Sequence, residues 1–106
     1  MLIVRSRNGV AVRLTEERGG HIARRHPEMA EQRERLLETV VEPDAILEGD
    51  EGALMAVRWY ADTPLTQKFL VVPYRELSSE DGFIVTAYLT SEPSPKRRIL
   101  WKRSGS

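Results

Sequence analysis

The 106-residue chain contains no cysteine, which excludes disulfides, thiolate metal ligands and a cysteine nucleophile. Its two histidines are too few for a three-histidine zinc site. No apolar run approaches the ~20 residues of a membrane helix, and an early charge at Arg5 argues against a signal peptide. We therefore expect a cytoplasmic domain without metal, cofactor or membrane contact.

The chain also has no net charge, because its 16 Lys and Arg residues balance its 16 Asp and Glu residues. The charges are unevenly distributed: residues 1–25 and 92–103 are basic, and residues 28–51 are acidic. A uniformly basic nucleic-acid-binding surface is therefore not expected. A local basic site built from both ends of the chain stays open, and the acidic middle is best explained as a solvated helix face.

The first half of the chain predicts a β-hairpin followed by two helices. Residues 1–14 form short strand-like runs around the tight-turn pair Asn8-Gly9. Residues 15–42 predict one helix near 16–25, capped by Thr15, and a second near 27–41. Pro27 separates the two, because proline restricts the residue before it and starts a helix well.

The second half predicts an antiparallel sheet over residues 45–90, with a basic tail over 91–106 that either adds an edge strand or stays mobile. Pro73 indicates an edge strand or a bulge at its position. The whole chain is expected to form a single α+β domain, 1–106. In it, two N-terminal helices pack on one face of an antiparallel β-meander of about four strands, preceded by the short hairpin.

Segment 83–90 has the strongest strand pattern in the chain. Alternation along a continuous strand divides its side chains between two faces. The helix-covered face is expected to hold Phe83, Val85, Ala87 and Leu89. The more open face is expected to hold Ile84, Thr86, Tyr88 and Thr90, and parity allows Arg58, Tyr60 and Lys68 to join it.

Segment 21–28 concentrates the residues best suited to chemistry: His21, Arg24, Arg25 and His26. Imidazoles exchange protons at neutral pH, and guanidinium groups bind phosphate. This combination suits RNA cleavage through the RNA's own 2′-hydroxyl, which needs a proton acceptor, a proton donor and a phosphate clamp. A structural role stays open, with His26 capping a helix and the arginines pairing with nearby glutamates.

The run H-I-x-x-R-H-P-E at residues 21–28 and the strand segment I-V-T-A-Y at 84–88 carry a family resemblance. Together with the helix between them, they resemble the barnase/EndoU/colicin/RelE-like domains of bacteria and phages. The resemblance covers roughly residues 14–90. It implies a metal-independent endoribonuclease of the toxin or phage-effector type, with an antiparallel sheet packed on N-terminal helices.

The implied catalytic residues are His21, His26, Thr86 and Tyr88. The candidate phosphate-binding residues are Arg24, Arg25, Lys68 and Arg58. The expected partners are RNA and a cognate antitoxin or inhibitor protein, and the chain is a monomer or a homodimer. The alternative is a non-catalytic module that docks RNA or a protein through the same sheet surface. The nuclease hypothesis requires the imidazoles and the strand hydroxyls to meet in one cleft bordered by cations.

Overall fold

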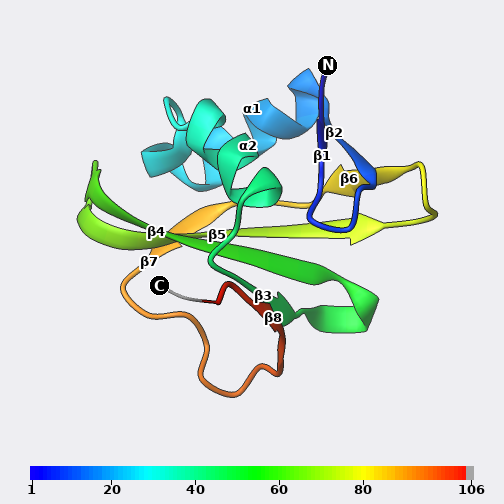
Figure 1. Cartoon of the computed structure of the whole chain (residues 1–106). Coiled ribbons are helices and arrows are strands. Elements are labelled where there is room, and N and C mark those ends of the chain that lie inside the picture. Colours follow the sequence, from blue (N-terminus) through cyan, green and yellow to red (C-terminus); the bar gives the residue numbers. More distant parts are fainter. Residues whose placement is uncertain (105–106) are drawn as a thin grey trace.

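In the computed structural model, which describes residues 1–104, the helices lie on one side of a curved sheet (Figure 1). The described residues form an α+β fold with two α-helices and eight strands. The helices are α1 (Glu16–Arg25) and α2 (Arg33–Val41), with short 3₁₀ turns η1 (Pro27–Met29) and η2 (Asp50–Gly52). The strands are β1 (Leu2–Arg5), β2 (Ala11–Leu14), β3 (Ala45–Glu48), β4 (Leu54–Thr63), β5 (Thr66–Glu76), β6 (Gly82–Ile84), β7 (Tyr88–Thr90) and β8 (Ile99–Lys102).

The sheet is larger than the expected meander of about four strands. Its order is β1-β2-β6-β5-β4-β3-β8, with β7 also paired to β5. The antiparallel run from β3 through β4 and β5 to β6 is present, but both of its ends are extended. The hairpin joins through a parallel β2–β6 pairing, and β8 from the basic tail pairs with β3. These additions satisfy backbone groups that bare edge strands would leave unpaired.

The hairpin and the first helix follow their local sequence signals. β1 and β2 pair antiparallel from Leu2↔Leu14 to Arg5↔Ala11, and Gly9 in the connection has a φ of 81°, which favours glycine. α1 begins after Thr15, whose hydroxyl accepts a hydrogen bond from the Arg18 amide at 3.1 Å. Both the hairpin and this capped helix were predicted from the sequence, and both are confirmed.

The second helix differs from the expectation of one helix over 27–41. Pro27 starts only the turn η1, and α2 begins at Arg33. Ala30 is the only apolar residue between Met29 and Leu36, so little packing supports a continuous helix there. Both Met29 and Leu36 are nevertheless buried in the core.

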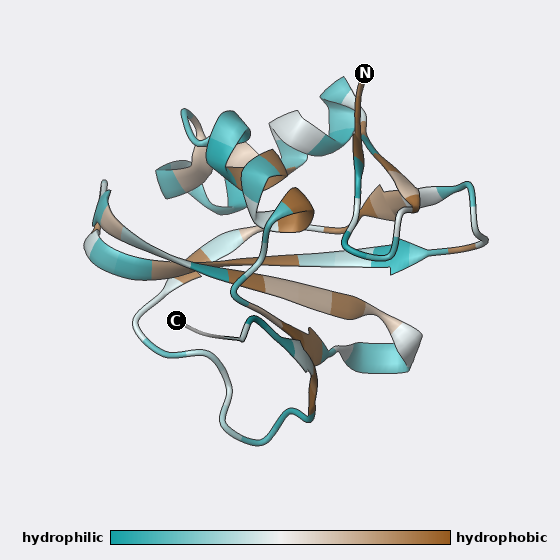
Figure 2. Cartoon of the chain, in the orientation of Figure 1, coloured by the Kyte–Doolittle hydropathy of each residue, from teal (hydrophilic) through white to brown (hydrophobic). Residues whose placement is uncertain are grey.

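Two apolar clusters lie on opposite faces of the sheet. Figure 2 shows hydrophobic residues interspersed with hydrophilic ones along the helices and the strands. The helix-side cluster joins helix residues such as Ile22, Leu36 and Val40 to inward-facing strand residues. The smaller cluster on the other face consists of Leu47, Met55, Val57 and Val71, with Phe69 and Tyr88 packed against it. Among the described residues, no helix has the length and apolar character needed to cross a membrane.

The expected continuous strand over 83–90 is broken, and this break corrects the predicted faces. The amides of Val85 and Thr86 both approach the Pro73 carbonyl, at 2.9 and 3.4 Å. Pro73 has no N–H to continue the ladder, so a bulge forms opposite it, which is one of the two alternatives expected at this position. Before the break, Ile84 lies in the helix-side core instead of Phe83. After it, Ala87 and Leu89 face the helices and Tyr88 faces away, as expected.

Candidate functional site

One side of the site is a stripe of charged side chains on α1. Arg18, His21 and Arg25 follow the spacing i, i+3, i+7, which places them on one helix face. Ile22, only 2% exposed, holds the helix on the core. His26 ends the helix, because the following proline disfavours a helical conformation at this residue. Its backbone N–H still donates to the Ile22 carbonyl at 2.7 Å, which keeps His26 beside the stripe.

The other side of the site comes from the broken strand. Val85 and Thr86 lie in the break, and Tyr88 begins β7. With Arg18, His21, Arg25 and His26, they line an open groove of about 460 Å³. The His26 and Tyr88 rings are in contact across it, with centroids 5.9 Å apart and planes tilted by 36°. Both histidines, Thr86 and Tyr88 therefore line the same groove, together with Arg18 and Arg25.

The groove is lined by guanidinium groups and imidazoles. Among the described residues that line it, four are arginine or histidine and none is acidic. Just outside the lining, a Glu28 carboxylate oxygen lies 3.8 Å from His26 Nδ1. Burial raises the pKa of Tyr88, an effect that nearby Arg97 opposes, so its phenol is a hydrogen-bond donor at neutral pH.

Three of the predicted phosphate-binding residues do not line the groove. The Arg24 guanidinium lies back along α1 above Gly20. Lys68 Nζ donates to Ser91 Oγ at 2.6 Å. Arg58 donates to the Glu42 carbonyl at 2.6 Å and lies 3.7 Å from Glu38, so it ties β4 to α2.

The positions of Arg58 and Lys68 have a common cause. Arg58 pairs across the strands with Leu70, which belongs to the helix-side core. Lys68, two residues from Leu70, has the same parity. Both side chains therefore belong to the helix-covered face, whereas Tyr88 packs on the other. The expectation that they share a surface with Tyr88 is wrong.

Sequence reasoning missed Arg18 and Val85 as groove residues. Arg18 had a usable signal, since it precedes His21 by one helical turn. Val85 had none, because only the break opposite Pro73 turns it toward the groove.

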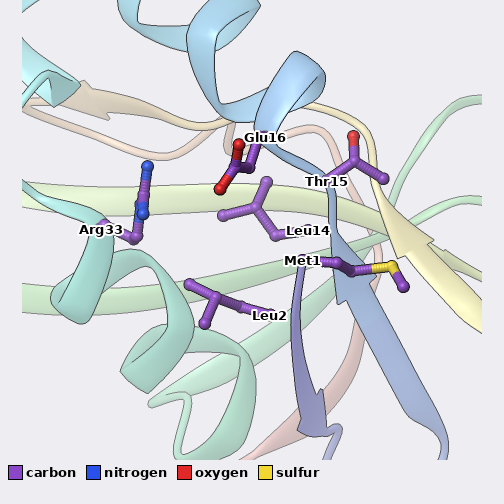
Figure 3. A pocket seen from close by; sticks show the side chains of 6 residues that line it. All are labelled: Met1, Leu2, Leu14, Thr15, Glu16 and Arg33. Atoms are coloured by element: carbon purple, nitrogen blue, oxygen red, sulfur yellow. The ribbon is translucent and has the colours of Figure 1, made fainter.

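A separate pocket near the N-terminus shares no residue with the groove (Figure 3). Its volume is about 70 Å³, well below the ~300 Å³ at which small-molecule sites begin. Its lining residues are Met1, Leu2, Leu14, Thr15, Glu16 and Arg33. Within residues 1–104, no three His, Asp or Glu side chains are grouped as a metal site would require.

Comparison with protein-family models, with curated proteins and with solved structures gives no match to this chain.

Proposed function

We propose that this chain is a metal-independent endoribonuclease-like domain of the toxin or phage-effector type. The observation that supports this function is the groove in which His21, His26 and Arg25 of the helical segment face Thr86 and Tyr88 of the sheet. Cleavage of RNA by its own 2′-hydroxyl requires few groups from the protein, and the groove supplies each of them.

The reaction consists of two proton transfers and one displacement at phosphorus. A base removes the 2′-hydroxyl proton, and the 2′-oxygen attacks the adjacent phosphorus. The bond from phosphorus to the 5′-oxygen breaks, and an acid protonates that oxygen. The products are a 2′,3′-cyclic phosphate and a 5′-hydroxyl.

His26 is the better placed of the two histidines to act as the base. Its Nδ1 faces the Glu28 carboxylate, and its ring rests against Tyr88, so two neighbours restrict its orientation. His21, exposed on α1, then serves as the acid. A base whose orientation is fixed by a third group is a recurrent arrangement in enzymes.

The remaining groove residues bind the phosphate. Arg18 and Arg25 lie one turn before and one turn after His21 on the same helix face. Their guanidinium groups can neutralise the charge that builds on the non-bridging oxygens. Tyr88, protonated at neutral pH, donates a hydrogen bond, and the Thr86 hydroxyl orients the phosphate.

The test is cleavage of a single-stranded RNA oligonucleotide in EDTA, with product ends identified by mass spectrometry. We expect a 2′,3′-cyclic phosphate and no cleavage of the all-deoxy strand. His26→Gln should lower the rate by about 10²- to 10⁴-fold. Arg25→Ala should also lower it, whereas Arg24→Ala, which removes the same charge outside the groove, should leave it unchanged.

Circular dichroism of each variant separates loss of chemistry from loss of fold. Cleavage that persists in His26→Gln, or that needs a divalent metal, would contradict the proposal. RNA binding without any product, weakened by Arg25→Ala, would instead identify a non-catalytic RNA-binding module.

A further inference from the structure

A second cavity lies on the face of the sheet away from the helices. Its volume is about 300 Å³, at the lower end for small-molecule sites. Its apolar wall includes Met55 from β4, Pro73 from β5 and Val85 from the strand break. Its polar groups include Asp50 from η2 and Arg97 from the loop before β8. Figure 1 shows this loop on the side of the sheet opposite the helices.

The cavity adjoins the groove. Val85, Thr86 and Tyr88 line both of them. A strand of RNA whose phosphate lies beside His26 would therefore pass Tyr88 on its way to the cavity. The bulge opposite Pro73 takes Val85 out of the regular strand alternation, and Val85 belongs to both linings.

The polar groups are held in fixed positions. Arg97 Nη1 lies 3.1 Å from Asp50 Oδ1 and donates to the Glu48 carbonyl at 3.2 Å. Arg75 donates to the Glu51 carbonyl at 2.7 Å and to the Asp50 carbonyl at 3.3 Å, which fastens the η2 turn. The Asp50 side chain is still 85% exposed, so its carboxylate has acceptor sites free for a ligand.

We propose that this cavity receives one unpaired nucleobase of the RNA, from the nucleotide next to the phosphate bound in the groove. The inference rests on the proposed function and specifies its substrate as single-stranded RNA, since bases in a duplex are not free to enter a pocket. The ring packs against Met55 and Pro73. Asp50 accepts from an exocyclic amino group, so adenine is favoured over uracil, which has no amino group.

The experiment follows the methionine methyl groups by NMR in the full chain carrying ¹³C-methyl methionine. The chain has three methionines, and Met55→Leu identifies the Met55 signal by its loss. Adenosine 3′-monophosphate, which carries both base and phosphate, should shift the Met55 methyl through its ring current. Met29, buried under the helices, is the internal control and should not shift. Uridine 3′-monophosphate should bind several-fold more weakly than adenosine 3′-monophosphate. The Asp50→Asn substitution should reduce this difference in affinity between the two nucleotides.

A Met55 signal unmoved by millimolar adenosine 3′-monophosphate would overturn the assignment, as would an equal shift with inorganic phosphate alone. Equal affinity for the two nucleotides would overturn the role of Asp50. The readout needs no cleavage, so the two proposals can fail separately. RNA cleavage without a Met55 shift rejects only the base cavity, and a Met55 shift without RNA cleavage rejects only the catalytic function.

Discussion

Replacing a tyrosine by phenylalanine should have opposite effects on the free energy of unfolding at two positions on neighbouring strands. Tyr74 on β5 is completely buried, and its hydroxyl has no hydrogen-bond partner among residues 1–104. Burial raises the pKa of Tyr74 well above its usual value, with a smaller contribution from Glu76. Tyr60 on β4, in contrast, donates its hydroxyl to a Glu38 carboxylate oxygen at 2.6 Å.

The magnitudes follow from these surroundings. An unsatisfied buried hydroxyl costs about 1–3 kcal/mol, and phenylalanine fills the same apolar space without that cost. Tyr74→Phe should therefore raise the free energy of unfolding by about 1 kcal/mol, near the lower limit of this range. Tyr60→Phe breaks a satisfied bond to a charged group and should lower the free energy of unfolding by about 1 kcal/mol.

Urea denaturation followed by circular dichroism measures both changes, and thermal unfolding should show shifts of about 4 °C in opposite directions. The m-values should stay equal, because neither substitution alters the surface exposed on unfolding. A Tyr74→Phe variant that is less stable than the parent would refute the reasoning. It would mean that the hydroxyl makes a stabilising interaction in the folded protein.

Two further predictions concern alkaline stability and the attachment of α1. The pKa of Tyr60 is raised to about 12, by burial first and by the Glu38 hydrogen bond second. The fold therefore favours the neutral phenol. The contribution of Tyr60 to the free energy of unfolding should be complete below pH 10 and should be lost as the pH rises toward 12. In urea titrations, the Tyr60→Phe variant should lose less stability over that interval than the parent protein. Ile22→Ala truncates the one buried side chain of α1. In the same titrations at neutral pH, it should lower the free energy of unfolding by about 3 kcal/mol. A decrease of less than about 1 kcal/mol would show that α1 is held mainly by other contacts.

The charges that line the groove explain how a chain of zero net charge could bind the phosphate that we propose as its ligand. Arg18 and Arg25 face the groove, whereas many of the acids elsewhere form local ion pairs. Asp62 pairs with Arg35 at 2.8 Å, and Glu48 pairs with Arg98 at 3.2 Å. Local field, not total charge, decides where an anion binds at physiological salt, because screening limits the reach of distant charges to about 8 Å.

Several elements were predictable because their causes are local. The Asn8-Gly9 pair and the strand patterns beside it predicted the hairpin. Thr15 and Pro27 predicted where α1 begins and ends. The strand β8 was only one of two options for the tail, since pairing depends on a free edge that the tail sequence does not reveal. The same distinction holds for the candidate site. The side chains that α1 contributes could be predicted from helical spacing, whereas those that the sheet contributes could not.

The sequence by itself determined that His21 and Arg25 share a helix face, that His26 ends that helix, and that Pro73 interrupts a ladder. Each of these depends on the geometry of a few consecutive residues. Only the tertiary structure decided that Tyr88 reaches His26 while Arg58 and Lys68 do not. Strand alternation relates side chains within one strand, but which face the helices cover, and where a bulge reverses the alternation, depends on how distant segments pack together.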